Sequence, residues 1–542
     1  MMRRLLSTLG VFCVLSGAAL GQQASAAKPA FTIADIHDSP HMAFPFSNGG
    51  QLNGDRYNLR QSTIVDMIAL AYGVKVEMVQ SGPSWLEMKR FDIAAKADPK
   101  TSAADLKLML QSLLAERFKL AMHKGEAPMP AYLLTAPGGK TRMKQSAEGE
   151  EKNCRPDPTP QTAGGAPLIV VSCTAMGVDE LATFLNQVAN GYLVEPVLNQ
   201  TGLEGSWDFT LKWTGMGQRA KAGAEAVSIF DAVDKNLGLK LELKTAPRPV
   251  WIVDSVNEKP TANSPAVAKE LPEPPPAQFE VATIKPSRAD ERPSGRVSNG
   301  QVSLSATTLR FIMPFAWDLN PVDHQMIVNA PGWLDEDKFD ILAKAPMQEA
   351  APGKPAVQMD DHEFRQMLRA LLIDRFQMKV HMEDRPIDAY KMVADHPKLK
   401  EADPKSRTHC KEGPGPDGKD PRATNPILTQ LMTCQNITMK QLGEELSHYA
   451  AGYIYTPALD ATGLKGSYDL TLSWSAANLT ILKPPPSAGE QQNSGQQGAS
   501  DPNGAVTLYD AMDKQLGVKM VKEKRLVPVL VIDHIEETPT AN

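Results

Sequence analysis

The stretch TGLEGSWDFTLKW at residues 201–213 returns as TGLKGSYDLTLSW at residues 462–474, with nine of its thirteen positions identical. In both versions two glycines follow a threonine, and the large apolar side chains after them alternate with polar ones. This pattern predicts a glycine turn that leads into a strand with one buried face. Because so specific a stretch occurs twice in one chain, we expect two copies of a single folding unit.

Four further segments recur in the same order, at an offset that grows from 248 to 279 residues along the chain. Such growth is expected when loops lengthen while helices and strands are kept. Between the halves lies SPAVAKELPEPPPAQ at residues 264–278, whose prolines favour an extended, semi-rigid linker. We therefore predict a first copy at residues 27–263 and a second copy at residues 279–542. The recurring pairs are SWLEMKRFDIAAKA (84–97) with GWLDEDKFDILAKA (332–345), ERFKLAMH (116–123) with DRFQMKVH (374–381), FDAVDKNLGLKLE (230–242) with YDAMDKQLGVKMV (509–521), and VWIVDSVNEKPTAN (250–263) with VLVIDHIEETPTAN (529–542).

Residues 1–26 are typical of a secretory signal peptide. Arg3 and Arg4 precede an apolar run from Leu5 to Leu20, and small residues at 24–26 predict cleavage after Ala26. The apolar run is too short and too interrupted for a membrane span, and no later stretch approaches the necessary length. We expect a mature chain that is secreted or periplasmic, with no transmembrane segment.

The charge of the mature chain argues against nucleic acid as a partner. Removal of Arg3 and Arg4 leaves 55 basic and 63 acidic residues, a formal charge of −8. Phosphate binding requires clustered lysine and arginine side chains, and the sequence contains no such cluster.

Four cysteines remain after the signal peptide, two in each copy. Cys154 and Cys173 precede a predicted helix in the first copy, and Cys410 and Cys434 precede the same helix in the second. An oxidising compartment favours disulfides, and neither a CxxC motif nor a suitable histidine spacing supports a metal site. Of the three possible pairings, one bond within each copy is the simplest: Cys154 with Cys173 and Cys410 with Cys434.

Helical and strand patterns alternate within each copy. Residues 62–74 predict a short helix capped by Ser62, and residues 102–118 predict a longer helix that begins at a Ser102–Asp105 capping box. Asp360 and Glu363 predict the same box in the second copy, where Pro314 is expected to shorten or kink the first helix. Because the strands follow one another through short connections, we predict an α+β fold of two homologous domains, each a mixed or antiparallel sheet with helices mainly on one face.

No complete motif for a metal, a phosphate, a dinucleotide or a serine nucleophile occurs, so we assign no cofactor, metal ligand or catalytic residue. Trp85 and Trp333 follow turns and either form an aromatic platform for a sugar or protein, or anchor the sheet to its helix, which we favour. His123 and His381 are the only histidines at matched positions, and an imidazole without a neighbouring nucleophile is usually structural. These four residues are weak candidates for binding.

A hydrolase is the main competing hypothesis. Its residues would come from matched acids, Asp92 with Asp340 or Asp208 with Asp469, together with the matched histidines. The same acids equally suit the capping of turns or pairing with nearby arginines.

Taken as an ordered set, the motifs WLxxxxFDIxAKA, ERFKLxxH, the paired cysteines, TGLxGSxDxTLxW and the closing VxVIDxxExPTxN resemble a soil-associated family of secreted acidobacterial proteins built on a domain of unknown function. The resemblance spans nearly the whole mature chain and implies no established activity, cofactor or catalytic residue. In some relatives the domain is joined to a membrane metallopeptidase of the antibiotic-sensor type, which implies a sensing or docking part outside the cytoplasm.

The sequence favours a secreted, non-enzymatic binding or protein-interaction module over an enzyme. A duplicated unit offers two sites, and linkage of two sites raises avidity when the linker lets both engage. The expected partner is an extracytoplasmic protein or an envelope ligand. Two alternatives stay open at this point: an extracytoplasmic hydrolase, and a structural component of the cell envelope.

Overall fold

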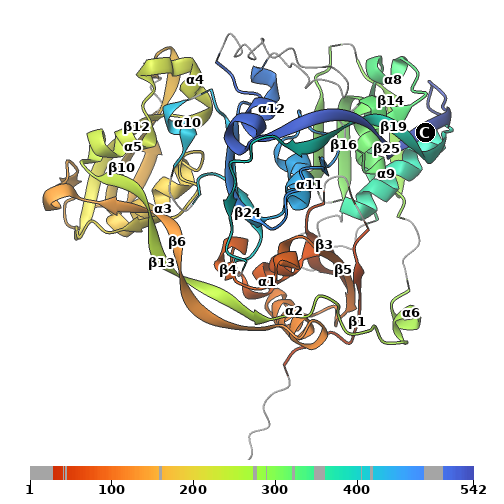
Figure 1. The fold of residues 1–542 in the computed structure, drawn as a ribbon, viewed down its shortest axis with the longest axis horizontal. Coiled ribbons are helices and arrows are strands. Elements are labelled where there is room, and N and C mark those ends of the chain that lie inside the picture. Colours follow the sequence, from red (N-terminus) through yellow and green to blue (C-terminus); the bar gives the residue numbers. More distant parts are fainter. Residues whose placement is uncertain are drawn as a thin grey trace, which may run out of the picture.

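The computed structural model describes residues 28–541 except 41, 43–44, 158–160, 273–276, 289, 299, 320–323, 347–360, 405, 416–418, 426 and 481–503. The predicted signal peptide and the predicted helix cap at Asp360 therefore lie outside the described residues. So do most of the prolines of the linker. What is described contains both predicted copies and confirms their α+β class (Figure 1).

The first copy begins with a lobe in which a four-stranded antiparallel sheet, ordered β1-β5-β3-β2, carries two helices. Apolar side chains of the helices and of the central strands form one buried core, which includes Met67, Phe91 and Leu114. We call this the first N-lobe. Its elements are β1 (Ile33–Asp38), β2 (Asn48–Asn53), β3 (Arg56–Thr63), α1 (Ile64–Tyr72), the 3₁₀ turns η1 (Val76–Met78) and η2 (Ser84–Glu87), β4 (Val79–Gln80), β5 (Arg90–Lys96) and α2 (Ala103–Arg117).

A second lobe of the first copy, the first C-lobe, has its own core around Leu185, Leu211 and Trp213. Its sheet is ordered β7-β12-β10-β8, with β9 beside β10. The quoted stretch at residues 201–213 forms the turn and strand predicted for it, with Trp213 buried. The elements are β7 (Lys144–Gln145), β8 (Asn153–Pro156), β9 (Thr162–Ala163), β10 (Ala166–Gly177), α3 (Val178–Val188), β12 (Ser206–Thr214), α4 (Arg219–Ala222), α5 (Ile229–Ala232) and a π-helical turn (Val233–Leu237).

Two long antiparallel strands, β6 (Ala121–Thr135) and β13 (Lys240–Ser255), join the lobes as a twisted ribbon (Figure 1). The short strand β4 pairs with β13 at the N-lobe end, and β11 (Val197–Asn199) pairs with β6 at the C-lobe end, both in parallel. Each copy thus divides its strands among two lobe sheets and a ribbon.

The second copy repeats this arrangement, with lobe sheets ordered β14-β18-β16-β15 and β20-β24-β22-β21 and a ribbon of β19 and β25. Its N-lobe contains β14 (Val281–Pro286), β15 (Ser294–Ser298), β16 (Gln301–Thr308), α7 (Leu309–Trp317), β17 (Ile327–Val328), α8 (Trp333–Glu336), β18 (Lys338–Lys344) and α9 (Asp361–Arg375). The ribbon and C-lobe contain β19 (Lys379–Ala394), β20 (Lys400–Glu401), β21 (His409–Glu412), α10 (Pro421–Thr424), β22 (Gln430–Ile437), α11 (Met439–Tyr449), β23 (Leu459–Asp460), β24 (Tyr468–Trp474), α12 (Leu508–Ala511) and β25 (Val518–His534).

The lobes themselves share one topology, which shows a second level of repetition. In each lobe an edge strand is followed by a hairpin, a helix, a strand at the centre of the sheet and a second helix region, and then by a ribbon strand. The four lobes also share a β-bulge at the end of the inner hairpin strand. One bulge residue in each has a positive φ close to 50°, at Gln61, Ala175, Ala306 and Asn436.

An aspartate on the neighbouring strand holds each bulge, because its Oδ1 accepts a hydrogen bond from the N–H of the positive-φ residue. The distances lie between 2.8 and 3.0 Å. Each aspartate stands between an aromatic and an apolar residue, as in FDI and WDF, so the triplet marks the same position in every lobe. The four aspartates are Asp92, Asp208, Asp340 and Asp469.

Within each copy, the arginine of the matched ERF or DRF segment hydrogen-bonds to the closing PTAN segment. Arg117, which is 8% exposed at the end of α2, donates to the carbonyl oxygen of Ala34 in β1 and to both Thr261 and Asn263 of the closing segment. In the second copy Arg375 donates in the same way to the carbonyl oxygens of Ala282 and Ala541. The end of each copy is thereby fastened to its first strand.

Three local expectations change. The cap of α1 is Thr63, with Asp66 completing the capping box, because β3 continues one residue beyond Ser62. Pro314 does not shorten α7, which spans nine residues as α1 does. The linker is not wholly extended, since the residues between Pro265 and Pro272 form the helical turn α6 (Val267–Glu270). For α2 the Ser102 half of the predicted capping box is confirmed, because the Ser102 side chain accepts a hydrogen bond from the Asp105 N–H.

Candidate functional site

The matched histidines lie on the ribbons, and each contacts an aspartate of the neighbouring ribbon strand. His123 Nδ1 lies 2.9 Å from Asp254 Oδ1, and His381 Nδ1 lies 2.8 Å from Asp533 Oδ2. The hydrogen bond with Asp533 raises the pKa of His381 above its ordinary value. All four side chains are about half exposed. In the described part of the chain, neither imidazole hydrogen-bonds to a serine, threonine or cysteine side chain.

Trp85 and Trp333 are half-buried and pack against the cores of their N-lobes. The Trp333 ring stacks on Phe376 with 6.4 Å between centroids. This is the geometry of an anchor between the sheet and its helix. Of three pockets among the described residues, none is lined by either tryptophan or by either matched histidine.

The matched acids hold the four bulges described above. Asp92 is 6% exposed and accepts hydrogen bonds from the Gln61 N–H at 2.8 Å and from Ser39 Oγ at 2.5 Å. In the first C-lobe, hydrogen bonds from Ser146 and the Ala175 N–H lower the pKa of Asp208. Carboxylates in these positions shape the backbone.

Asp92→Ala is expected to destabilise the first N-lobe by about 2 kcal/mol, because it leaves the buried Gln61 N–H without an acceptor. Urea unfolding followed by circular dichroism measures this. Asp55→Ala is the control, since Asp55 is half exposed and pairs with Lys96 at the surface. Equal stability of the two variants would contradict the structural role of the aspartate.

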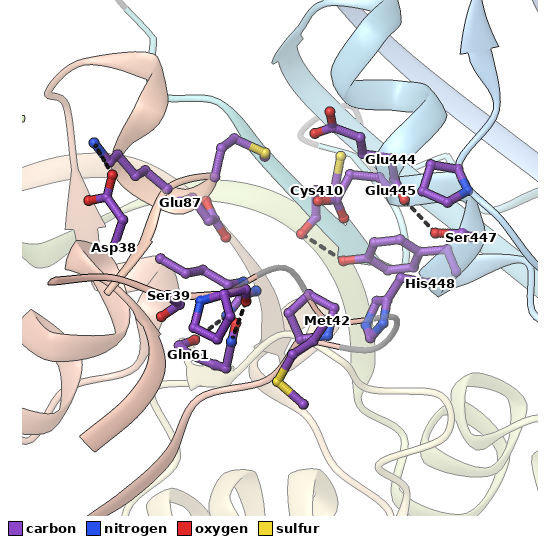
Figure 2. Close-up of a pocket in the computed structure, with 17 residues that line it drawn as sticks. Asp38, Ser39, Met42, Gln61, Glu87, Cys410, Glu444, Glu445, Ser447 and His448 are labelled. Carbon is purple, nitrogen blue, oxygen red and sulfur yellow. Dashed lines mark hydrogen bonds and ion pairs between the residues drawn. The ribbon is translucent and has the colours of Figure 1, made fainter. Parts of the chain in front are cut away.

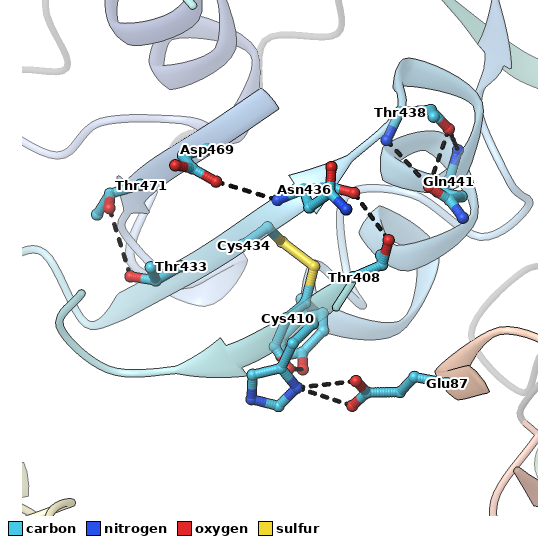
Figure 3. The surroundings of a disulfide bond; sticks show 12 residues. Glu87, Thr408, Cys410, Thr433, Cys434, Asn436, Thr438, Gln441, Asp469 and Thr471 are labelled. Atoms are coloured by element: carbon cyan, nitrogen blue, oxygen red, sulfur yellow. Dashed lines mark hydrogen bonds and ion pairs between the residues drawn. A yellow bond between two sulfur atoms is a disulfide. The ribbon is translucent and has the colours of Figure 1, made fainter. Parts of the chain in front are cut away.

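The sulfur atoms of Cys154 and Cys173 are bonded to one another, as are those of Cys410 and Cys434. In both copies the bond joins two neighbouring antiparallel strands at directly opposed positions. The second bond lies in a hairpin that the first copy contacts, and Figure 3 shows Glu87 of the first copy reaching to it.

Residues 406–415 of the second copy, which include β21 and which we call the wedge, contact both lobes of the first copy. Toward the N-lobe, Arg407 Nη1 lies 3.3 Å and His409 Nδ1 2.8 Å from the carboxylate of Glu87. Toward the C-lobe, Lys411 pairs with Glu195. Figure 1 shows the second C-lobe, which carries the wedge, beside the first copy.

These contacts use positions at which the copies differ. Arg407 and His409 correspond to Glu151 and Asn153 in the first copy, so its C-lobe presents no matching cation or imidazole. Glu87 corresponds to Asp335, which Arg310 already binds within the second copy at 3.0 Å. We call the contacts of the wedge with Glu87 and Glu195 the joint between the copies. The contacts with Glu87 are specific to the second C-lobe and the first N-lobe.

Beside the joint lies a cleft of about 630 Å³ that both copies line (Figure 2). The first copy contributes the segment after β1, the bulge residue Gln61 and the turn from η2 into β5. The second contributes α11, Cys410 and Pro457. The lining residues include Asp38, Met42, Glu87, Met88, Lys89 and Arg90 on one side, and Glu444, Glu445, Ser447, His448 and Tyr449 on the other.

Most charges in the cleft are already paired. Lys89 Nζ lies 3.3 Å from Asp38, and Arg90 donates to the carbonyl oxygen of Gln61 at 2.5 Å. Glu445 has no such partner among the described residues. Burial, followed by the nearby charge of Glu87, raises the pKa of Glu445 to about 7. Burial also raises the pKa of Tyr449, whose hydroxyl donates to the Cys410 carbonyl oxygen at 2.9 Å.

At the matched place in the second copy lies a hollow of about 500 Å³, lined by residues of that copy alone. It adjoins Glu336 and Asp337, which correspond to Met88 and Lys89. The hollow beside the start of the central strand is thus common to both N-lobes, and the second C-lobe covers the first of them.

Sequence reasoning missed the cleft because it searched for residues that the copies share. Glu87, Arg407 and Glu445 stand where the copies differ, and unmatched charges in one sequence give no signal of contact across 320 residues or more. A weak signal existed in hindsight, since the helix of residues 439–449 carries Glu445 where the first copy has the apolar Phe184.

In the described part of the chain, no helix is both long and apolar enough to cross a membrane. No curated protein and no solved structure matches this chain. A family model described as "Protein of unknown function (DUF3738)" matches residues 65–256 and 310–535, one segment in each copy. Since the two segments together cover well over half of the sequence, the chain belongs to the DUF3738 family and carries its domain in two copies.

Proposed function

We propose that this chain is a secreted or periplasmic binding protein whose ligand occupies the cleft between the first N-lobe and α11. The observation that carries the proposal is the cleft itself, because both copies line it and do so with residues that differ between them. A volume of about 630 Å³ with apolar and polar walls is in the range of small-molecule sites. Met42, Met88 and Tyr449 supply apolar surface, while carboxylates supply polar contacts.

A location outside the cytoplasm is part of this proposal. Two disulfides are compatible with an oxidising compartment. The predicted signal peptide at residues 1–26 would direct export, and the mature chain would consist of the domains at 27–263 and 279–542 with the linker at 264–278 between them. A mass measurement of protein recovered from the envelope fraction tests this, with an N-terminus at Ala27 as the expected result.

The hydrolase alternative has less support. The acids that it would use hold backbone bulges, and both His–Asp pairs lie half exposed on the ribbons. A ligand in the cleft would contact both copies at once. Such a contact would suit a protein that senses a ligand or docks to a partner.

His448→Trp is expected to block the cleft, because His448 is an exposed residue of α11 that lines it. The matched control is Gln187→Trp, at the corresponding exposed position of α3. Fractions of small molecules and peptides from an envelope extract are added, and thermal unfolding is followed. A ligand at 100 times its Kd stabilises the native state by about 2.7 kcal/mol.

We expect a fraction that raises the Tm of the original protein and of the Gln187→Trp variant, and leaves the His448→Trp variant unchanged. The proposal fails if no fraction raises the Tm, or if both variants respond equally.

A further inference from the structure

Glu445 is the one carboxyl group of the cleft wall that is both half-buried and without a basic partner in the part of the chain that the structure describes. It projects from α11 of the second copy toward the first N-lobe (Figure 2). The opposite wall carries Glu87, the carboxylate on which Arg407 and His409 of the joint converge. Two acids from different copies therefore face each other across one cleft.

The other charged groups around Glu445 do not neutralise it. From the first copy, the charge of Arg90 lowers the pKa of Glu445, but burial and Glu87 outweigh it. Arg90 donates to the Gln61 carbonyl oxygen and lies 3.8 Å from Asp66, and Lys89 pairs with Asp38 and Glu258. From α11 itself, Glu444 adds a second negative charge and His448 is exposed. The Tyr449 hydroxyl donates a hydrogen bond to the Cys410 carbonyl oxygen.

We propose that protonation of Glu445 keeps the cleft closed, and that its ionisation opens the cleft. This rests on the proposed function, because it assigns the regulation of the same site. Partial burial in the cleft wall disfavours the ionised form of Glu445, and a wider cleft would hydrate that form more fully. Ionisation also places like charges on Glu445 and Glu87 across the joint. Both effects drive α11 away from the first N-lobe.

The pH range follows from the two states of the carboxyl group. In the closed cleft the pKa of Glu445 is raised to about 7, and in an open, hydrated cleft it returns to the ordinary value of 4.5. A group whose pKa is higher in the closed state favours closure fully below the lower pKa and loses that contribution as the pH rises through the higher one. The equilibrium constant for closure should therefore fall by roughly 10- to 100-fold between pH 5 and pH 8.

Small-angle X-ray scattering and amide hydrogen exchange of the full chain, without ligand, test this from pH 5 to pH 8. In the original protein we expect the radius of gyration to grow with pH. The rate of amide hydrogen exchange at η2 and β21 is corrected for the intrinsic effect of pH. It should rise by the same factor by which the equilibrium constant for closure falls. Glu445→Gln should stay closed throughout. Glu444→Gln, one residue away and exposed, should behave as the original protein does.

Two results would overturn the proposal: a pH response that persists in Glu445→Gln, or none in the original protein. His409→Asn places at this position the residue that the first copy has there. This variant distinguishes an effect of His409 from an effect of Glu445. A response that this variant abolishes and Glu445→Gln keeps would assign the switch to His409. Because closure is measured without ligand, its failure is distinct from a failure to find a ligand by thermal unfolding.

Discussion

Arg407→Ala is expected to separate the two copies while each stays folded. Arg407 is 3% exposed, lies 3.3 Å from Glu87 and also donates to the Val76 carbonyl oxygen. Removing one partner of a buried ion pair costs at most about 3–5 kcal/mol, and less where another group stays beside the remaining charge, as His409 does beside Glu87. Since the pair belongs to the joint, this cost falls on the contact between copies. Scattering should report a larger radius of gyration, and limited proteolysis should cut faster in the linker at residues 264–278.

Glu151→Ala is the matched control, because Glu151 occupies the corresponding position of the first copy and is exposed. It should leave both measurements unchanged. A compact Arg407→Ala protein with an uncut linker would show that the ion pair does not hold the copies together.

Replacing Cys410 and Cys434 together by serine is expected to destabilise the second C-lobe and to loosen the joint. The bond closes a loop of 24 residues, and the chain-entropy model assigns such a loop about 3 kcal/mol. His409 precedes Cys410 directly, so the hairpin that presents it to Glu87 loses its covalent tie. We expect a lower midpoint of urea unfolding. We also expect the radius of gyration to grow, as it should in Arg407→Ala.

The other disulfide provides the comparison. Replacing Cys154 and Cys173 by serine opens a loop of 19 residues and should lower stability by a similar amount. Its hairpin makes none of the joint contacts described for the wedge, so the scattering should match that of the original protein. If the two double variants enlarge the protein equally, the wedge has no special part in the joint.

Much of the fold could be predicted because the matched segments are partners of one another. The ERF and PTAN motifs meet at Arg117, and the matched histidines meet the aspartates of the closing strands. Both members of each contact occur at matched positions in both copies. A search for repeats therefore found the residues that hold each copy together, including the paired cysteines.

The likeness between lobes was beyond such a search. The lobes of one copy share a topology, but along the sequence they share little more than a triplet around the bulge aspartate, such as FDI in one and WDF in the other. The bulge needs one carboxylate that accepts a hydrogen bond from the N–H of the positive-φ residue. The residues around that aspartate can therefore differ between the lobes. The cleft escaped prediction for a related reason, since contacts such as Glu87 with His409 occur once.

The fastening of each copy to its first strand has a consequence for how the chain is made. Asn263 accepts a hydrogen bond from the Ile36 N–H, 227 residues earlier in the chain. The strand β6 pairs along its length with β13, which is synthesised about 120 residues later. Neither the ribbon nor this tie can form until almost the whole copy has left the ribosome. Folds that depend on such distant pairings form slowly, so the growing copy passes through an interval in which β6 is complete but still lacks its partner strand.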